Sequence, residues 1–138
     1  MLPKNSIITP HPKEFERLFG KTDNSLERIE KAQQKAQELG IVIVLKGAFT
    51  AVCSPDGNVY FNSTGNPGMA TGGMGDVLTG VIAGLLSQHY SPLESALLGV
   101  FIHGFSADLA LENQSEESLL PSDVIQYLGK SFKILHQK

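Results

Sequence analysis

A glycine-rich stretch from Asn62 to Gly80 carries the chemistry that the sequence indicates most directly. It holds six glycines, no lysine or arginine, and one acidic residue, Asp76, after which an apolar helical pattern begins. Glycine leaves backbone N–H groups bare, and a helix start adds the positive end of its dipole, so such a loop can hold an anion. We interpret Gly72–Gly75 as an anion-binding backbone and Asp76 as a base that faces a substrate hydroxyl.

Two simpler interpretations of this stretch stay open. An aspartate near a helix N-terminus is commonly only a favourable cap, and a glycine-rich loop is commonly only a turn. The stretch does not match the P-loop pattern, because no lysine follows Gly75. It also lacks the G-x-G-x-x-G spacing that directly follows a strand in dinucleotide-binding folds.

Composition restricts the class of protein. The 138 residues suffice for one domain with a core, and 41% of them are hydrophobic, which suits a globular protein. A net charge of −3 without a basic run argues against a nucleic-acid partner. The single cysteine, Cys53, excludes an internal disulfide and lies in an apolar pattern typical of a core. No apolar run approaches the roughly 20 residues of a membrane span, and the N-terminus does not resemble a signal peptide, so we expect no membrane partner and a cytoplasmic location.

His11 and Lys46 are further candidate ligand contacts. His11 lies between Pro10 and Pro12, which hold the chain extended and then suit the first turn of a helix. Such a strand-to-helix junction is a usual place for ligand contacts in α/β sheets, although a histidine that bonds the backbone is an equal alternative. Lys46, followed by Gly47, ends an apolar strand pattern and would either meet a phosphate or be solvated.

The order of predicted elements indicates an α/β fold. The run Ile41–Leu45 is rich in β-branched residues and suits a strand covered on both faces, as in a parallel sheet. Pro55-Asp56-Gly57 separates two short strand patterns and indicates a hairpin. Helical periods account for most of the remainder. We expect strands at 6–9, 41–45, 50–54 and 58–61, and helices at 12–19, 24–39, 75–87, 91–112 and from 121 onwards.

Two of these helices carry specific expectations. The helix at 75–87 is apolar nearly all round and should therefore be buried, with small residues such as Gly80 and Gly84 allowing close packing. The next helix contains His103 and Asp108. We interpret both as structural rather than catalytic, since buried helices often carry a polar group that is hydrogen-bonded locally.

Three stretches together resemble a known enzyme family. They are T-P-H-P-K-E-F-E-R-L-F-G at 9–20, V-L-K-G-A-F-T-A-V at 44–52, and N-S-T-G-N-P-G-M-A-T-G-G-M-G-D-V-L-T-G-V-I-A-G-L at 62–85. With these motifs the chain resembles the ADP/ATP-dependent NAD(P)H-hydrate dehydratases, a branch of the ribokinase-like superfamily. The resemblance runs over nearly the whole chain. It implies the C-terminal part of a three-layer α/β/α fold.

The resemblance also implies an activity, which is metabolite repair by a lyase. The S epimer of hydrated NADH or NADPH would be converted back to the normal cofactor, with ATP or ADP consumed. This implies phosphorylation of the hydrate hydroxyl, followed by loss of phosphate to restore the double bond. Mg²⁺ is implied by the phosphate chemistry, and no acidic cluster in the sequence identifies its ligands.

Residue by residue, the resemblance implies roles for the candidates. Asp76 would be the catalytic base and would contact the hydrate, and His11 would also contact the hydrated dinucleotide. The backbone N–H groups of Gly73, Met74 and Gly75 would form an anion hole for the transferring phosphoryl group. The nucleotide-binding residues implied by the match are Lys46, Gly47, Ala48, Phe49, Thr50 and Gly75.

The chain departs from the family pattern in length. Family members carry a further N-terminal part that completes the sheet and part of the hydrate pocket. We therefore expect residues 1–138 to form the C-terminal portion of one dehydratase domain whose N-terminal part is absent. Core exposed in this way would favour a homo-oligomer.

Two other functions stay open, a small-alcohol kinase of the same superfamily (for a vitamin precursor or a sugar) and a non-catalytic nucleotide-binding fragment. The N-P-G-M-A turn, which begins with Asn66, and the T-P-H-P-x-E-F stretch favour the dehydratase.

Overall fold

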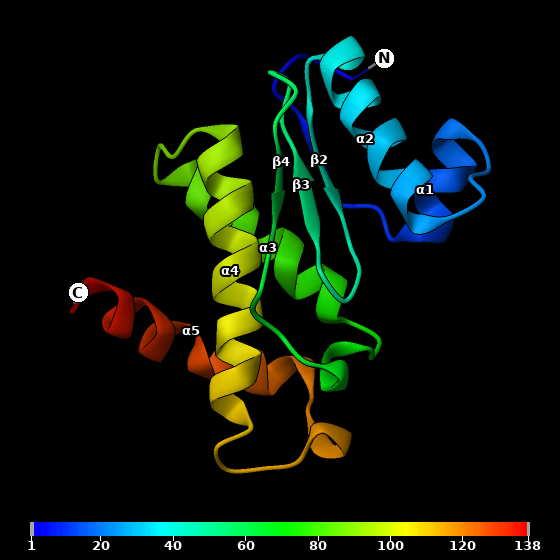
Figure 1. Ribbon diagram of the computed structural model, residues 1–138. Helices are drawn as coiled ribbons and strands as arrows, with labels where there is room; N and C mark the ends of the chain where they lie inside the picture. Colours follow the sequence, from blue (N-terminus) through cyan, green and yellow to red (C-terminus); the bar gives the residue numbers. More distant parts are fainter. Residues whose placement is uncertain (1, 138) are drawn as a thin grey trace.

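The computed structural model describes residues 2–137, which form three layers around a four-stranded sheet (Figure 1). The strands lie in the order β1 (Ile7–Ile8), β2 (Val42–Leu45), β3 (Ala51–Cys53) and β4 (Val59–Phe61). The helices are α1 (Pro12–Phe19), α2 (Ser25–Leu39), α3 (Met74–Ser87), α4 (Pro92–Ala110) and α5 (Pro121–His136), with short 3₁₀ turns η1 (Pro67–Met69) and η2 (Glu116–Ser118). The predicted order of elements is confirmed.

The sheet is mixed rather than parallel throughout. Strand β2 pairs in parallel with β1 but antiparallel with β3, and β3 and β4 form the predicted hairpin. The hairpin turn contains Gly57 at φ +93°, a conformation that glycine adopts without strain. Among residues 2–137, no strand pairs with the other edge of β1.

Strand β2 is buried on both faces, as its apolar run predicts. Ile43 and Leu45 pack in one core with Phe15 of α1 and with the alanines of α2. Val42 and Val44 point to the opposite face, where they pack against α3 and α4. Because successive strand residues alternate between faces, this short strand joins both helical layers and fixes where its C-terminal end lies.

Helix α3 corrects one expectation. Only one face of it is buried, through Met74, Leu78, Ile82 and Leu85. Gly80 and Gly84 lie on the exposed face, where an added Cβ would have no neighbouring atom of the described chain within 4 Å. The close packing between helices comes instead from α4, because a Cβ at Gly99 would lie 2.7 Å from Ile82 Cγ1. Apolar composition alone did not show which face would be covered.

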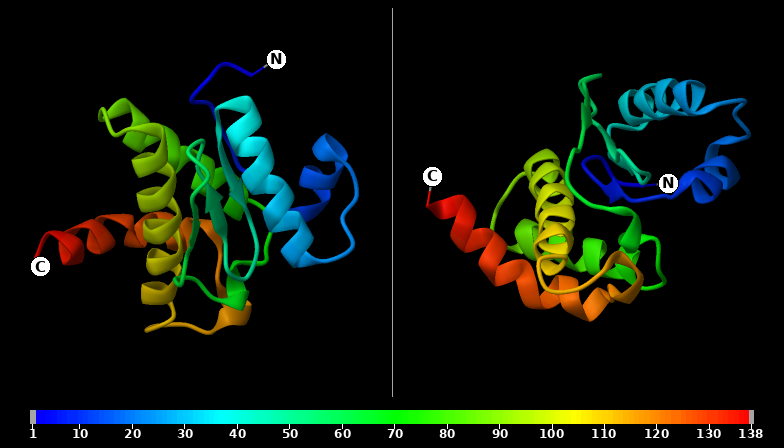
Figure 2. Two further views of the ribbon diagram at one scale, coloured as in Figure 1. Left: turned by 45° about the horizontal axis from the view of Figure 1, so that its top comes forward. Right: turned by 60° about the horizontal axis from the view of Figure 1, so that its bottom comes forward.

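Helix α4 is the centre of the second helical layer. It packs on α3 and on the sheet, and α5 packs on it on the side away from the strands (Figure 2). By length and composition α4 could cross a membrane, contrary to the expectation that no apolar run approaches that length. However, 61% of its apolar window is buried within the fold, as expected for a core helix.

Candidate functional site

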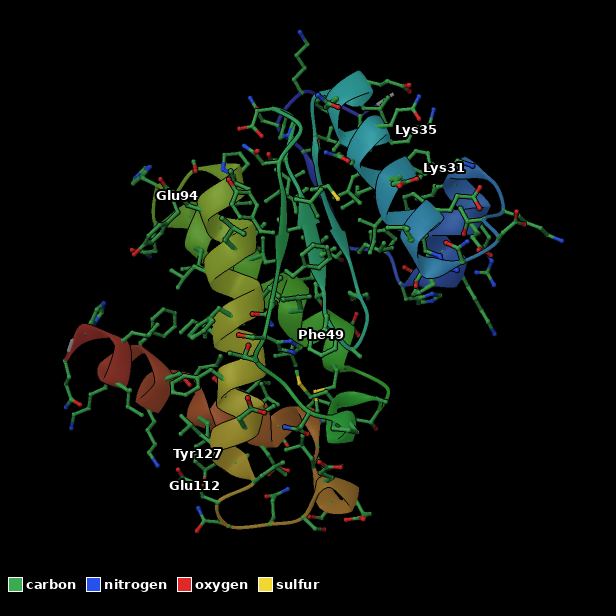
Figure 3. The ribbon with its side chains drawn as sticks, in the orientation of Figure 1. Lys31, Lys35, Phe49, Glu94, Glu112 and Tyr127 are labelled. Atoms are coloured by element: carbon green, nitrogen blue, oxygen red, sulfur yellow. The ribbon has the colours of Figure 1, made fainter. Side chains whose placement is uncertain are left out.

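A cleft of about 890 Å³ opens where the C-terminal end of β2 meets the start of α3. One part of its wall is the Lys46 loop, defined here as Lys46–Thr50, from which the Phe49 ring projects (Figure 3). Another part is the glycine-rich stretch, and α4 lies behind it. The lining comprises residues 11–12, 46–50, 62–67, 69–71, 74–75, Leu78, Val100, His103 and Gly104.

The cleft gathers most of the residues singled out from the sequence. His11, the whole Lys46 loop, Met74 and Gly75 all line it, although they come from separate parts of the chain. Three candidates do not line it. Gly72 and Gly73 lie between the lining residues Thr71 and Met74, and Asp76 lies between the lining residues Gly75 and Leu78, on the exposed side of α3.

The start of α3 has the geometry of an anion site. Gly73 is its N-cap at φ +95°, a conformation that favours glycine, and a Cβ there would also approach Pro121 Cγ to a tight 3.1 Å. A Cβ at Gly75 would lie 2.9 Å from the Lys46 Nζ, which places the ammonium group against the first turn of the helix. A helix N-terminus and a lysine are both positive, so together they attract an anion.

Asp76 lies in the first turn of α3, and its side chain is exposed. Gly80 and Ala83 follow it at helical spacing on the same exposed face. The carboxylate therefore stands at the edge of the cleft, on the side of α3 that the described chain leaves uncovered.

His11 has the structural role that the sequence left as an alternative, and it also lines the cleft. It is the N-cap of α1, where its Nδ1 accepts a hydrogen bond from the Glu14 backbone N–H at 3.2 Å. Its Nε2 lies 2.7 Å from Glu14 Oε1, and the Glu14 carboxylate also accepts from the His11 backbone N–H. This reciprocal capping box holds the imidazole at the strand-to-helix junction.

Helix α4 holds the glycine-rich stretch in place. Thr64 Oγ1 donates to the Phe101 carbonyl at 2.9 Å. The carboxylate of Asp108 accepts from the Gly65 backbone N–H at 2.9 Å and from Asn66 Nδ2 at 2.8 Å. A Cβ at Gly104 would lie 2.7 Å from the Thr64 carbonyl carbon, so the two backbones are in close contact. The structural interpretation of Asp108 agrees with these contacts.

Sequence reasoning missed the position of His103. This α4 side chain is only 8% exposed, yet it lines the cleft, and its Nε2 has no hydrogen-bond partner among residues 2–137. The pKa of His103 falls to about 4, mainly because the side chain is buried; a hydrogen bond with the Met74 backbone opposes this shift, and the nearby Lys46 charge adds to it. The imidazole is therefore neutral at neutral pH. The apolar helix pattern around His103 gave no signal that this face meets a cleft.

The described residues gather no side-chain metal cluster, and the cysteine thiol is buried. Within residues 2–137, no group of three His, Cys, Asp or Glu side chains is placed to hold a metal ion. Cys53 is fully buried in the core, as predicted, and burial raises the pKa of its thiol to about 11. That thiol is therefore not available as a thiolate nucleophile.

A second cleft of about 480 Å³ adjoins the Lys46 loop. It is lined by Arg28 and Ile29 of α2, by Phe61, and by most of the loop, including Phe49. The loop therefore borders both clefts, and three of its five residues are exposed. Phe49 is 72% exposed, which leaves its ring free to contact a ligand.

The comparisons in sequence point to one family. The family model for NAD(P)H-hydrate dehydratase matches residues 2–130. The bifunctional NAD(P)H-hydrate repair enzyme of Moorella thermoacetica is 45% identical over 134 residues, covering 96% of this chain and 25% of that protein. The ADP-dependent (S)-NAD(P)H-hydrate dehydratase of Bacillus subtilis is 42% identical over 132 residues, covering 92% of this chain and 48% of that protein.

The structural comparison gives the same result. The crystal structure of the Bacillus subtilis ADP/ATP-dependent NAD(P)H-hydrate dehydratase, co-crystallised with ATP and Mg²⁺, superposes with a TM-score of 0.88 at 41% identity. The superposition covers 96% of this chain and 50% of that chain. More distant neighbours with ribokinase-like folds confirm the α/β class. The chain spans between a quarter and a half of the length of the curated relatives it matches. On the family model and these identities, the chain belongs to the NAD(P)H-hydrate dehydratase family.

Proposed function

We propose that the chain acts in the nucleotide-dependent dehydration of the S epimer of hydrated NADH or NADPH, which restores NAD(P)H. The observation that carries the proposal is the cleft in which His11, the Lys46 loop and Gly75 meet, although the sequence separates them widely. These are the positions that the family motifs mark for hydrate and nucleotide. The Bacillus subtilis relative is named an ADP- or ATP-dependent NAD(P)H-hydrate dehydratase. This name supports the same substrates for the chain.

The nucleotide would lie along the Lys46 loop with its phosphates at the start of α3. Lys46 Nζ and the amides of the first turn of α3 offer positive charge there without a neutralising acid in the cleft lining. The exposed Phe49 ring offers a flat apolar surface for an adenine. Backbone N–H groups of Gly73, Met74 and Gly75 would stabilise the phosphoryl group in transfer.

Mg²⁺ fits this site as a companion of the nucleotide. Since residues 2–137 gather no trio of acidic or histidine ligands, the protein does not offer a complete cage. Mg²⁺ commonly keeps several waters and binds substrate phosphates, with few protein ligands. The metal would therefore neutralise phosphate charge, while Lys46 and the α3 amides orient the same phosphates.

Asp76 is the base in this proposal. Its carboxylate would take the proton of the hydrate hydroxyl, whose oxygen then attacks the terminal phosphorus of ATP or ADP and releases ADP or AMP. In the second step the carbon–oxygen bond breaks, phosphate leaves with the hydroxyl oxygen, and a proton is lost from the neighbouring carbon. The carbon–carbon double bond of the cofactor is thereby restored, and the water has effectively departed within the phosphate.

We also propose that the chain is the C-terminal portion of one dehydratase domain. Among residues 2–137, the outer edge of β1 has no paired strand, and the α3 face with Asp76, Gly80 and Gly84 has no covering element. The superposed Bacillus subtilis chain is about twice as long. An additional segment that pairs with β1 would cover this face and close the hydrate site around Asp76.

The test is an assay of hydrated NADPH with ATP and Mg²⁺, with the Bacillus subtilis dehydratase as positive control. We expect NADPH to appear together with ADP and phosphate, from this chain alone or after it is mixed with the N-terminal half of the Bacillus enzyme. Rescue only by the mixture would support the proposed domain boundary. A phosphorylated product from a panel of small alcohols, without NADPH repair, would instead identify a kinase, and ATP binding without turnover in any arrangement would identify a nucleotide-binding fragment.

The role of Asp76 is tested with Asp76→Asn in whichever arrangement is active. Removing a general base typically lowers the rate by about 10²–10⁴-fold. Because Asp76 does not line the nucleotide cleft, ATP affinity should stay within about 3-fold of the parent, measured by calorimetry. Near-normal turnover in the variant would contradict the assignment.

A further inference from the structure

We propose that Asp108 is a positioning residue that sets the shape of the ligand cleft through its hydrogen bonds to Gly65 and Asn66. We call this group the Asp108 latch. Asp108 does not line the cleft, whereas Gly65 and Asn66 do, so the carboxylate would act on a ligand only through the segment that it holds. The effect on ligand binding rests on the proposed function, but the effect on the segment itself does not.

Both oxygens of the Asp108 carboxylate are engaged. One accepts from the Gly65 backbone N–H at 2.9 Å and the other from Asn66 Nδ2 at 2.8 Å. Asn66 passes the constraint along the chain, because its Oδ1 accepts from the Gly68 backbone N–H at 3.1 Å as the N-cap of η1. Two hydrogen bonds thus connect helix α4 with the turn that forms one wall of the cleft, and the third holds that turn internally.

The segment needs such a connection because it has little structure of its own. Between β4 and α3 the chain forms only the single 3₁₀ turn η1. Gly65 has φ +104°, a conformation that side-chain-bearing residues rarely adopt, and so its N–H direction is set by an unusual backbone angle. Gly104, one helical turn before Asp108, lets this backbone approach α4 closely. The close approach brings Gly65 near α4, and the carboxylate then orients it.

The chemistry of the latch makes it sensitive to a single atom. An ionised carboxylate only accepts hydrogen bonds, which suits a site facing two donors. Asp108→Asn keeps the shape but replaces one acceptor by an NH₂ group, which then faces another donor. Leaving a partly buried donor unsatisfied costs the desolvation of that group, so the segment should move rather than keep this contact.

The same chemistry predicts a rescue by exchanging the two residues. In the double variant Asp108→Asn with Asn66→Asp, the new asparagine accepts from Gly65 N–H and donates to the new aspartate. The second oxygen of that aspartate still accepts from Gly68 N–H. Every donor keeps an acceptor, although neither original residue remains in place. A role that merely required bulk or negative charge at position 108 would not be restored in this way.

The experiment compares the parent, both single variants and the double variant in three measurements. Calorimetry gives the affinity for ATP with Mg²⁺, hydrogen exchange gives the protection of the Gly65 and Gly68 amides, and thermal unfolding shows that each protein is folded. We expect each single variant to bind ATP about 10-fold more weakly and to exchange these amides at least 10-fold faster. The double variant should return to within about 3-fold of the parent in both.

Each contrary outcome is distinct. Parent-like affinity and exchange in Asp108→Asn would overturn the latch, as would a double variant that recovers neither. Recovered amide protection without recovered affinity would show that these hydrogen bonds order the segment but do not set ATP affinity, which would overturn the proposed effect on the cleft. If Asp108→Asn is insoluble, Asn66→Ala removes the Nδ2 donor to Asp108, together with the acceptor for Gly68 N–H, and is judged by the same measurements. A parent that does not bind ATP would contradict the proposed function, while the exchange data would still decide the latch.

Discussion

The two loop walls of the cleft differ in how firmly the protein holds them. The glycine-rich stretch is fastened along its length, by Thr64 and Asp108 to α4 and by the close approach of Gly73 to Pro121 at the start of α5. The Lys46 loop has fewer such contacts. At its two ends, Lys46 N–H donates to the Pro10 carbonyl at 3.0 Å and the Thr50 carbonyl accepts from Asn62 N–H at 2.9 Å, whereas the Thr50 hydroxyl makes only long contacts of 3.3–3.4 Å to Gly47.

This difference indicates that the two walls have different roles in ligand binding. A preorganised wall loses little conformational freedom when a ligand binds, and it suits the transfer of a phosphoryl group, where geometry is critical. An exposed loop with few contacts can adapt to a ligand, but ordering it reduces affinity. Changes in the fastened wall should therefore affect stability first, whereas changes in the Lys46 loop should affect binding with little effect on stability.

The largest expected effect comes from the closest contact of the fastened wall. In Gly104→Ala the new Cβ would lie 2.7 Å from the Thr64 carbonyl carbon and 2.8 Å from the Gly65 nitrogen, both backbone atoms with little room to move. We expect a loss of about 3 kcal/mol, which lowers Tm by about 10 °C, measured by calorimetric or spectroscopic melting. The matched control is Gly129→Ala in α5, where a Cβ meets no neighbouring described atom within 4 Å. Equal melting temperatures for the two variants would show that the contact at Gly104 does not constrain the glycine-rich stretch.

The next effect is a pH dependence of the free energy of unfolding, which originates from His103 of α4. Because the pKa of His103 falls to about 4 in the folded protein, against about 6.5 when unfolded, the unfolded state binds more protons between these values. The stability that neutral His103 supports is therefore complete above pH 6.5 and is lost as the pH falls towards 4, by up to about 3 kcal/mol. Urea denaturation at pH 7 and pH 4.5 should show a smaller loss in His103→Gln than in the parent. Equal losses of stability in the parent and in His103→Gln would exclude His103 as the origin of the pH dependence.

A smaller effect, confined to binding, is expected from the adaptable wall. Lys46→Met removes the ammonium group beside Gly75 but keeps an apolar side chain of similar length. We expect ATP affinity to fall about 10-fold, equivalent to about 1.4 kcal/mol, with Tm changed by less than about 2 °C. Lys35→Met is the control, since Lys35 lies on α2 in a surface pair with Glu38 and away from both clefts. Calorimetric titration with ATP compares the affinities of the parent and the two variants. A large drop in Tm for Lys46→Met would show instead that Lys46 stabilises the fold.

Sequence analysis predicted the features that depend on local pattern. The hairpin at Asp56-Gly57, the two-sided burial of β2 and the start of α1 at Pro12 all follow from turn chemistry, periodicity or proline position. It also identified most of the cleft wall by family resemblance. It did not predict that His103 lines the cleft, and it misjudged the covered face of α3, since both depend on which helix packs where, and an apolar helix sequence does not encode that locally.

The smallest expected effect is on ATP affinity and comes from Phe49, whose side chain should contribute to binding but not to stability. Phe49 is 72% exposed at the tip of the Lys46 loop, so Phe49→Ala should change the free energy of unfolding by less than about 0.5 kcal/mol. Loss of a ring that stacks on a base typically weakens binding by about 1 kcal/mol or more, so ATP affinity should fall about 5-fold. Phe61→Ala is a matched control, because Phe61 is 60% exposed and lines the second cleft but not the first. If both variants weakened ATP binding equally, the adenine would lie in the second cleft, and the adaptable wall would extend to β4.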